Sequence, residues 1–532
     1  MRIDKVYIEQ FKNLNQFTID LDETKMQTVL LGENAAGKSN FLEALVIIFR
    51  DLDLEEQTSF NYTIEYKCKG NLIKVNGGPD VKNKYGLFLG ENKGDEIIYS
   101  TIVSKAAVKK NKELYLPKYV FSYYSGVSNR LLEHFDKHQF RFYRDLLKGI
   151  DSPPRPLFYA RLIHSHFVLM AFYGFPNEKI NTFLEDYLNI VGLESVLFVL
   201  KKPNWKGDTE EGDPKFWYSK GVVKEFLNDL WDASIAPIYH RDKVREDFNK
   251  HPDQEHLYLY ISNEEKLKKI AEKYGTNTEF FKSLESTYIS DLIQEVRVKV
   301  KKKNIDGEIT FKELSEGEQQ LLTVLGLLRF TKEEESLILL DEPDTHLNPL
   351  WKWKYMNLLE DVVERPETSQ IIMTTHDPLV IGGLTKEEIR IFYTEKGKDQ
   401  EGKDIMLVKT IAPDFDPKGL GVAGILTSEF FKLPSTLDED TLDILNRRNE
   451  LIAKQDDNKL TDKESLELKE IFYYLNNLGI NTTDRDPLYE KFIVALSKLE
   501  KPENIKSSPV ELKKQNEIAF DILKRIINES EK

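Results

Sequence analysis

Apolar and polar residues alternate along the first part of the chain, for example at Ile3, Val6 and Ile8. Alternation with a period of two is typical of strands that bury one face. A short apolar run then leads into a glycine-rich stretch at residue 32, and few polar residues interrupt positions 39–49. We therefore predict strands within residues 2–31 and, directly after the glycines, a helix over 39–49 that is buried against a sheet.

The middle of the chain changes its pattern twice. Residues 60–121 hold short apolar runs separated by glycines and lysines, which predicts an antiparallel lobe. Residues 130–290 are rich in aromatic side chains and are predicted to be mostly helical, with no heptad run long enough for a coiled coil. Over 295–303, valines alternate with basic residues such as Arg297 and Lys299, which predicts a half-buried strand with a basic outer face.

The last third of the chain begins with more strands and then becomes helical. Apolar runs at 389–395 and 404–411 predict a hairpin around a turn at 397–402. From residue 413 onward the spacing of apolar positions is helical, and the predicted helices cover 438–454, 460–478, 487–500 and 509–531. The second of these helices has one apolar face.

Composition narrows the class of protein. A chain of 532 residues is expected to form more than one domain, and 40% hydrophobic with 31% charged residues is typical of a globular protein. The net charge of −15 argues against a generally basic nucleic-acid coat, although a local basic stripe is compatible with it. The single Cys68 excludes an internal disulfide, and no signal-peptide or membrane-span pattern is found, so we predict a cytoplasmic location.

Gly32, Gly37, Lys38 and Ser39 form the pattern GxxxxGKS between the predicted strand and the predicted helix. In that context the backbone N–H groups of the loop and of the helix N-terminus can hold phosphate groups. Lys38 is then expected to reach the β- and γ-phosphates of a nucleotide, and the Ser39 hydroxyl is expected to bind Mg²⁺.

Two other apolar runs end in side chains suited to the same chemistry. The run 337–340 ends in Asp341 and Glu342. A carboxylate at such a strand end can hold the water shell of Mg²⁺, and the next one can polarise an attacking water. We therefore predict Asp341 as the metal residue and Glu342 as the general base. The run 371–375 ends at His376, which we predict to contact the γ-phosphate.

Five segments in this order resemble the ABC-type ATPase superfamily, and within it the SMC/RecF-like branch: IEQFKNLNQFTIDL, GENAAGKSNFLEAL, LSEGEQQLL, LILLDEPDTHLNP and QIIMTTHD. The resemblance covers residues 1–50 and 309–411. It implies ATP and Mg²⁺ as cofactors, ATP hydrolysis, and an active site closed by a second copy of the chain. By this likeness Ser315 and Gly317 bind the γ-phosphate held by the partner protomer, and residues 345–348 cross the dimer interface.

The same resemblance implies a full set of site residues. The implied nucleotide contacts are Lys12, Asn13, Gly32, Asn34, Ala36, Gly37, Lys38, Ser39, Asn40, Ser315, Gly317 and Glu318. The implied catalytic residues are Lys38, Glu342 and His376, and the implied metal residues are Ser39 and Asp341. Two departures from the family pattern occur. Ala35 stands where a third glycine is common, and the stretch 119–126 lacks the usual Mg²⁺-sensing glutamine, so Tyr124 or Ser125 takes its place or hydrolysis is slow.

The resemblance also implies the fold and its division. The expected fold class is α/β: an ABC-type P-loop ATPase head, in which a mixed sheet carries an antiparallel lobe, with a large helical insertion and a helical C-terminal extension. The expected domains are 1–125, the first half of the head; 126–294, the helical insertion; 295–411, the second half of the head; and 412–532, an extension that docks a partner.

Finer features narrow the family further. The YYSG before Arg130, the aromatic insertion and the segment GVAGILTSEFF at 421–431 resemble the ATPases of bacterial anti-phage systems of the Septu type, which also occur with retrons. This resemblance implies an ATP-driven dimerisation switch that controls a partner HNH nuclease. It also implies the reverse transcriptase and RNA of a retron as further partners. Whether the chain contacts DNA directly stays open.

Three other functions stay open. An ATPase–nuclease of the overcoming-lysogenisation type would need Glu395 and the pair Asp414 and Asp416 on strands of a metal-binding domain, which a hairpin turn and flanking prolines disfavour. A DNA-repair ATPase that clamps a duplex would need a basic surface, which the lysines and arginine of 297–303 and 105–112 could supply. A transporter subunit is disfavoured by the large insertion that separates the phosphate loop from residue 315.

Overall fold

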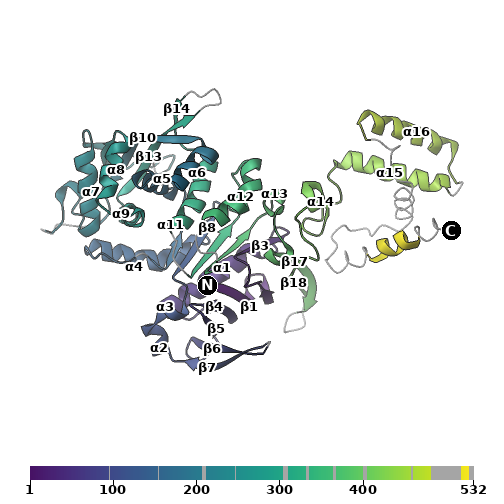
Figure 1. Cartoon of the computed structure of the whole chain (residues 1–532), viewed down its shortest axis with the longest axis horizontal. Coiled ribbons are helices and arrows are strands. Elements are labelled where there is room, and N and C mark those ends of the chain that lie inside the picture. Colours follow the sequence, from purple (N-terminus) through teal and green to yellow (C-terminus); the bar gives the residue numbers. More distant parts are fainter. Residues whose placement is uncertain are drawn as a thin grey trace.

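The computed structural model contains three sheets and their covering helices (Figure 1). It describes residues 1–94, 96–153, 155–205, 211–245, 247–303, 309–330, 335–362, 367–398, 404–456, 459–480 and 517–525. The predicted helix over 487–500 and most of the predicted turn at 397–402 lie outside the described residues. Of the predicted helix 509–531, only 517–525 is described, and that stretch is helical.

The central sheet has seven strands in the order β18-β17-β3-β16-β15-β8-β9, and all but the antiparallel edge strand β18 run parallel. Its strands are β3 (Gln27–Gly32), β8 (Tyr119–Tyr124), β9 (Leu157–Tyr159), β15 (Ser336–Asp341), β16 (Ser369–Thr374), β17 (Ile389–Lys398) and β18 (Asp404–Ile411). Parallel strands covered on both faces read as continuous apolar runs, and β15 and β16 are buried at every position. The predicted β17–β18 hairpin is confirmed.

Helix α1 (Lys38–Leu54) leaves the end of β3 and packs on one face of this sheet. Successive residues of β3 point into different cores: Leu30 belongs to the core shared with α1 and the N-terminal lobe, whereas Val29 and Leu31 belong to the core shared with the insertion. The phosphate loop therefore lies at the carboxyl edge of the parallel strands, where open α/β sheets place their ligands.

The antiparallel lobe is present as a six-stranded sheet in the order β2-β1-β4-β5-β6-β7, which also includes β1 and β2, whereas the end of the predicted range, from residue 119, belongs to the central sheet as β8. Its strands are β1 (Arg2–Phe11), β2 (Leu14–Asp20), β4 (Tyr62–Cys68), β5 (Asn71–Gly77), β6 (Tyr85–Lys93) and β7 (Glu96–Val103). The short helices α2 (Lys105–Lys110) and α3 (Lys112–Tyr115) follow it. Strand β18 contacts β2, so the lobe is joined to the central sheet along that edge.

The insertion contains the predicted helices, but it also contains strands of a five-stranded antiparallel sheet, in the order β11-β12-β10-β13-β14, that the sequence pattern does not indicate. Its strands are β10 (Ile190–Lys201), β11 (Ile238–Lys243), β12 (Asp253–Ile261), β13 (Ile293–Lys303) and β14 (Ile309–Lys312). The apolar run in β10 cannot be told from a buried helix by its period alone. Strand β13 is half-buried with a basic face, as predicted. It pairs with β10, so it joins the sheet of the insertion, although the expected boundary at residue 294 assigns most of it to the second half of the head.

Helices cover one face of the insertion sheet and join it to the central sheet. They are α4 (Asp136–Leu147), α5 (His164–Gly174), α6 (Glu178–Leu188), α7 (Gly221–Ala233), α8 (Glu264–Glu272) and α9 (Asn277–Ile289), with the short helices η1 (Leu132–Phe135) and η2 (Pro214–Phe216). After β14 the chain forms α10 (Glu316–Leu321), the π-helix η3 (Leu322–Gly326) and α11 (Leu327–Phe330). Helix α5 packs on η3.

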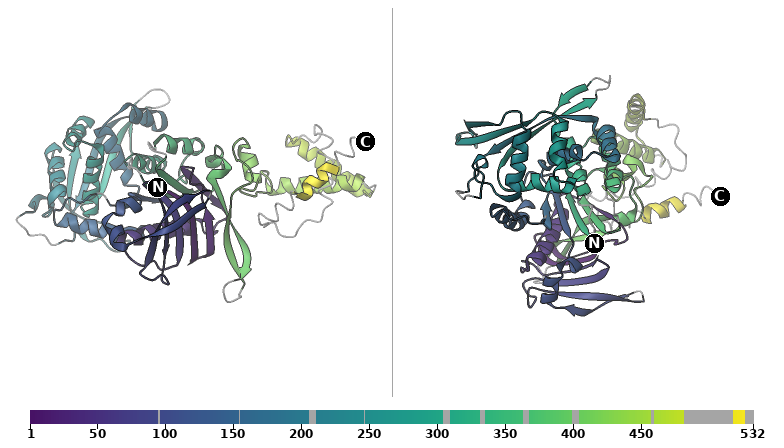
Figure 2. Two further views of the ribbon diagram at one scale, coloured as in Figure 1. Left: turned by 60° about the horizontal axis from the view of Figure 1, so that its bottom comes forward. Right: turned by 60° about the vertical axis from the view of Figure 1, so that its left-hand side comes forward.

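The C-terminal part projects from the body of the molecule (Figure 2, left). Its helices are α15 (Glu439–Asp456) and α16 (Asp462–Asn477), which pack on each other. Nearer the body lie α12 (Pro349–Val362), α13 (Pro378–Ile381), η4 (Lys386–Glu388) and α14 (Gly421–Thr427). Among the described residues, no helix is both long enough and apolar enough to span a bilayer.

Candidate functional site

Three positions of the phosphate loop, residues 32, 35 and 37, have a positive φ, which favours glycine. Gly32 has φ 139°, and a Cβ there would lie 2.3 Å from the carbonyl oxygen of Phe392. Gly37 has φ 94° and caps the N-terminus of α1. Ala35 has φ 62°, a left-handed conformation that costs a residue with a Cβ roughly 1 kcal/mol. The missing third glycine therefore leaves the loop conformation in place at a small conformational cost.

Lys38 extends back into this loop. Its Nζ donates to the carbonyl oxygens of Gly32, at 2.7 Å, and Glu33, at 3.0 Å. The side chain is almost fully buried, and this burial lowers the pKa of Lys38 to about 8, even though the nearby carboxylates of Asp341 and Glu342 favour the charged form. The ammonium group is therefore held where anionic oxygens bound by the loop would meet it.

This lowered pKa predicts a pH dependence of ATP binding. Burial favours neutral Lys38 in the free protein, whereas phosphate groups favour the charged form, so binding above about pH 8 must take up a proton. The association constant for ATP is expected to fall by about tenfold per pH unit above that point. Calorimetry in buffers of different ionisation enthalpy would detect the proton uptake. An affinity that stays flat up to about pH 9.5 would contradict this account of Lys38.

Ser39 and Asp341 meet although they lie far apart in the sequence. The Ser39 hydroxyl donates to Oδ1 of Asp341 at 2.9 Å, and the Thr374 hydroxyl donates to the same oxygen at 2.7 Å. Oδ2 of Asp341 is buried and has no hydrogen-bond partner. Burial raises the pKa of this carboxyl. A hydroxyl and an unpartnered carboxylate oxygen are hard oxygen ligands, so these residues fit a Mg²⁺ ion that keeps most of its waters.

Glu342 and His376 lie next to each other at neighbouring strand ends. The carboxylate of Glu342 is 3.5 Å from Nε2 of His376, and both side chains are partly exposed. The backbone N–H of Glu342 donates to the Thr374 hydroxyl at 2.9 Å, so one threonine orients both acidic residues of the pair. Burial, and then the charge of Lys38, lowers the pKa of His376, which favours a neutral imidazole.

Asn13 and Asn40 brace the phosphate loop from the outside. Nδ2 of Asn13 donates to the carbonyl oxygen of Ala35 at 2.8 Å, and Oδ1 of Asn13 accepts from Asn40 at 2.7 Å. Lys12, which the family resemblance places near the nucleotide, is paired with Glu43 at 2.6 Å. The structure thus brings Lys12, Asn13 and Asn40 to the outside of the loop.

Sequence reasoning missed the buried Glu43, which contacts three basic side chains close to the predicted metal residue Ser39. It lies one helical turn after Ser39 on α1 and contacts Lys12, Arg130 and His134. The Arg130 guanidinium lies 5.7 Å from the Tyr124 ring centroid, and its Nε and Nη2 make no hydrogen bond. The only available signal was the spacing of four between residues 39 and 43, which places both side chains on one helix face.

The signature residues lie at the start of α10. Ser315 caps this helix in a capping box with Glu318, whose carboxylate accepts from the Ser315 N–H at 2.8 Å and also contacts Lys302. A Cβ on Gly317 would lie 2.7 Å from the carbonyl oxygen of His346, so the helix packs closely on the loop 345–348. Ser315 itself is exposed, and none of its described hydrogen bonds reaches the phosphate loop.

Residues 119–126, which lack the glutamine usual in the family, end close to Asp341 and Glu342. The Ser125 N–H donates to the carbonyl oxygen of Asp341 at 3.2 Å, and the Ser125 hydroxyl lies 3.0 Å from that of Thr345. Gln320 accepts from the N–H of His346 at 2.9 Å. The loop 345–348 therefore contacts both the end of β8 and the signature helix.

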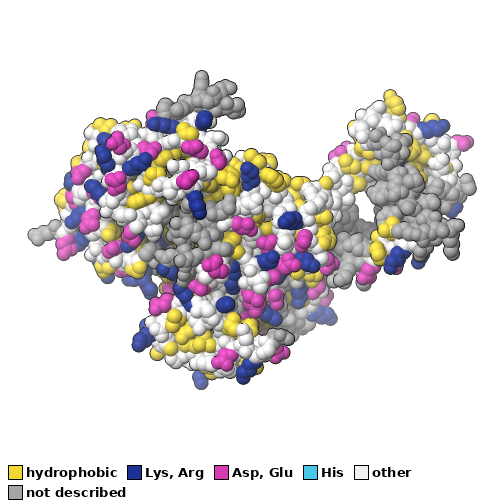
Figure 3. All heavy atoms as spheres, viewed as in Figure 1, with side chains coloured by type: hydrophobic (Ala, Val, Ile, Leu, Met, Phe, Trp, Pro, Cys, Tyr) yellow, Lys and Arg dark blue, Asp and Glu magenta, His cyan; other side chains and the backbone are white. Residues whose placement is uncertain are grey.

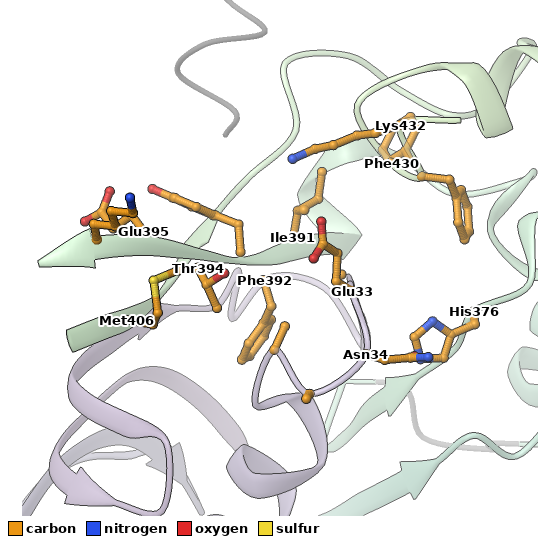
Figure 4. Close-up of a pocket in the computed structure, with 16 residues that line it drawn as sticks. Glu33, Asn34, His376, Ile391, Phe392, Thr394, Glu395, Met406, Phe430 and Lys432 are labelled. Atoms are coloured by element: carbon orange, nitrogen blue, oxygen red, sulfur yellow. The ribbon is translucent and has the colours of Figure 1, made fainter. Parts of the chain in front are cut away.

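A cavity of about 960 Å³ opens beside the phosphate loop. Its walls are residues 32–36, His376, strand β17 and residues 430–432. Figure 4 shows His376 beside Asn34 at one end, and Glu395 and Met406 at the other. Asn34 is exposed at this cavity, whereas Ala36 is buried. The Ala36 N–H donates to the carbonyl oxygen of Glu33 at 3.2 Å.

Two protein-family models match the chain. One, described as "AAA ATPase domain", matches residues 1–148, and the other, described as "AAA domain, putative AbiEii toxin, Type IV TA system", matches residues 180–382. The first contains the phosphate loop, and the second contains the signature, the acidic pair and His376. Both models describe AAA domains, and each covers one half of the predicted ATPase site.

The similar proteins with curated names include one retron protein and two Septu proteins. The chain is 22% identical over 508 residues to the "Retron Vc95 probable ATPase" of Vibrio cholerae, which covers 87% of this chain and 86% of that protein. It is 27% identical over 158 residues to the "Septu protein PtuA" of Bacillus mycoides, covering 30% of this chain and 20% of that protein. A PtuA of Bacillus thuringiensis is 33% identical over 97 residues, which is 24% of its length. The alignments to PtuA thus span about a quarter or less of those proteins.

The comparison with solved structures found SMC head domains. The SMC head bound to the C-terminal winged-helix domain of ScpA is 11% identical, with a TM-score of 0.31, covering 77% of this chain and 98% of that chain. The SMC head of Thermotoga maritima is 12% identical, also with a TM-score of 0.31, covering 78% of this chain and all of that chain.

Proposed function

We propose that this ATPase hydrolyses ATP in a composite site that two copies of the chain form head to tail. The observation that carries this proposal is the separation of the two halves of the site. Lys38, Ser39 and Asp341 lie together, whereas the exposed Ser315 caps a helix that contacts the loop 345–348 instead. A second protomer supplies the missing half by docking its signature helix over the phosphate loop.

Exposed apolar side chains flank this face. Leu350 and Trp353, at the start of α12 just beyond the loop 345–348, are 57% and 64% exposed. Val127, close after the contact between Ser125 and Thr345, is fully exposed. Large apolar residues gathered on one surface favour burial against another protein. Their position around the site supports a second copy as the partner.

Each residue of the site has a proposed task. Lys38 neutralises charge on the phosphates, and Mg²⁺, when bound by Ser39 and Asp341, supplies further charge neutralisation and orients the phosphate oxygens. Glu342 accepts a proton from the attacking water. Neutral His376 orients the same water or the γ-phosphate by a hydrogen bond. The Arg130 guanidinium, whose Nε lies 3.7 Å from the Glu43 carboxylate, adds positive charge that favours ionised Asp341.

The composite site predicts the effect of Ser315→Arg. A long cation at the helix N-terminus opposes the helix dipole and occupies the space that the partner's nucleotide requires. The variant is expected to bind ATP with unchanged affinity but to lose about 100-fold or more in hydrolysis rate, because the sandwich cannot close. Nucleotide titration and a phosphate-release assay measure the two quantities.

A matched control is Ser104→Arg, which makes the same substitution at another exposed serine that caps a helix, α2, and that is not a predicted nucleotide contact. It should retain hydrolysis within about threefold of the wild type. If Ser315→Arg hydrolysed ATP at the wild-type rate, a site shared between protomers would be excluded.

We further propose that the dimer is the ATPase subunit of a bacterial anti-phage system and controls a partner HNH nuclease. The similarity to a retron ATPase along 86% of its length, and to PtuA over shorter stretches, supports this proposal. The projecting hairpin of α15 and α16 offers a docking surface, since Leu466 and Tyr473 are 61% and 72% exposed. A reverse transcriptase with its RNA is the further partner expected if the system is a retron.

Co-purification tests the defence proposal. The tagged chain is expressed from its native operon, with and without ATP, and everything that elutes at equal stoichiometry is identified. Recovery of an HNH protein is the expected result. Recovery of the ATPase alone, retained on duplex DNA only with ATP, would favour the repair-clamp function instead.

The ATPase–nuclease alternative gains no support from the described residues. Glu395 pairs with Leu407 inside the β17–β18 hairpin, and Asp416 accepts from the N–H of Lys386 at 2.8 Å in a loop. These carboxylates are not brought together, and the described residues contain no group of three or more His, Cys, Asp or Glu side chains that could hold a metal.

A further inference from the structure

The outer face of the insertion sheet, which the proposed ATPase function does not use, carries a distinctive set of side chains. Strands β10, β12 and β13 turn Val196, Leu259 and Val298 inward to the shared core. Because side chains alternate along a strand, the neighbours of these residues point to the opposite, outer face. The right view in Figure 2 shows these strands at the upper outer edge of the molecule, with helices packed beneath them.

Two tyrosines occupy this outer face on β12. Tyr258 and Tyr260 lie two residues apart, and Tyr260 is 40% exposed. The register places Tyr260 opposite Leu197 of β10, and Leu197 opposite Arg297 of β13. Two strand spacings therefore put the backbones of Tyr260 and Arg297 roughly 10 Å apart in one row across the sheet.

A row of basic side chains follows the same face along β13. Arg297, Lys299 and Lys301 are all exposed and lie at alternate positions. The stem of Lys301 crosses Gly192 of β10, where a Cβ would lie 3.3 Å from its Cδ. Gly192 is buried, so the stem of Lys301 lies directly on the backbone of β10.

An acidic side chain lies at each end of this row: Glu295 beside Arg297, and Glu264, whose Oε2 would lie 3.7 Å from a Cβ on Gly192, next to Lys301. Glu295 accepts from Arg297 at 2.8 Å, and both side chains are about half exposed, so solvent weakens this pair. No ion pair is found for Lys299 or Lys301 among the described residues. Figure 3 shows acidic and basic side chains interspersed over the insertion, so this row is a local exception to the net charge of −15.

We propose that this outer face, defined by Tyr258, Tyr260, Arg297, Lys299 and Lys301, binds single-stranded nucleic acid. Exposed aromatic rings on a sheet can stack on unpaired bases, and a parallel row of cations can follow the phosphates. A duplex hides its bases from such rings, so the tyrosines favour a single strand over a double helix. The face binds either DNA or RNA, since both offer the same bases and phosphates.

The position of this face connects it to the ATPase. Strand β13 pairs with β14, and β14 leads within three residues to Ser315. Lys302, next to Lys301, contacts the Glu318 carboxylate that also holds Ser315 in its capping box. A nucleic acid bound across β13 therefore lies next to Lys302, and Lys302 contacts the residue that holds Ser315 in place. This link rests on the proposed composite site, whereas the binding itself does not.

Fluorescence anisotropy tests the binding with the full chain and no nucleotide. The probes are thymidine and uridine oligomers of about 20 residues and a hairpin duplex of similar length. The wild type is expected to bind the single strands at least about tenfold more tightly than the duplex. The double variant Lys299→Glu/Lys301→Glu is expected to lose about tenfold or more in affinity and about 1.4 from the slope of log affinity against log salt concentration.

The matched control is Lys5→Glu/Lys67→Glu, which makes the same charge change at two exposed strand lysines of the N-terminal lobe and should bind within about twofold of the wild type. Tyr260→Ala should lower the affinity for the single strands by about tenfold and leave the affinity for the duplex unchanged. If both double variants lost affinity equally, the loss would come from net charge alone, and the proposal would be overturned. Wild-type protein that prefers the duplex, or a Tyr260→Ala variant with unchanged single-strand affinity, would overturn it as well. Unchanged melting temperatures verify that each variant is folded.

Discussion

Replacing Lys38 by alanine is expected to weaken ATP binding by about 100-fold or more, because charge-assisted hydrogen bonds to phosphate are among the strongest that a side chain makes. Nζ of Lys38 already lies inside the phosphate loop, on the carbonyl oxygens of Gly32 and Glu33. The substitution removes the one buried cation of that loop. Calorimetric titration with ATP and Mg²⁺ measures the loss.

The matched control is Lys109→Ala, which removes an equal charge from an exposed site on α2 and should leave ATP affinity within about twofold. The Lys38 variant should also lose the fall in affinity above about pH 8 that the wild type is expected to show. Retention of micromolar ATP binding by Lys38→Ala would mean that the nucleotide binds elsewhere.

Glu342→Gln is expected to lower the hydrolysis rate by about 1000-fold while ATP still binds, because an amide has the shape of the carboxylate but cannot take a proton from water. The contacts that place Glu342 come from its backbone N–H and from His376, and the amide can keep both. ATP-bound dimers should therefore accumulate. Light scattering with and without ATP measures the dimer, and phosphate release measures the rate.

Glu33→Gln is the control, since Glu33 is an exposed carboxylate of the same loop and should hydrolyse ATP within about threefold of the wild type. If Glu342→Gln turned over ATP normally, another group would have to act as the base. The nearest other titratable group is His376, whose lowered pKa leaves it neutral and able to accept a proton.

The parts of the structure that sequence could predict are those fixed by local pattern. Alternation in β1 and β2, the apolar runs of β15 and β16, and the glycines before α1 each follow from side-chain period or backbone sterics. The contact between Ser39 and Asp341 could also be expected, because parallel strands bring their carboxyl ends to one edge. The phosphate loop conformation survives Ala35 because the strain of one residue is small.

The parts that sequence could not predict depend on partners far apart along the chain. Strand β10 pairs with β12 and β13 across long connections, and its apolar run does not reveal those partners. The residues around Glu43 come from the turn after β1, from α1 and from residues 130–134, and no sequence motif links these segments. The packing of Gly317 against His346 depends on a close backbone approach that only coordinates reveal.

The central claim, an active site shared by two protomers, is tested most directly by mixing two inactive variants. Lys38→Ala lacks a working phosphate loop, and Ser315→Arg lacks a working signature. In a head-to-tail dimer of one of each, the intact loop of one protomer faces the intact signature of the other. The account predicts that the equimolar mixture recovers about a quarter of the wild-type hydrolysis rate, since about half of randomly paired dimers are mixed and each has one complete site. A mixture that forms dimers and stays inactive would contradict the account.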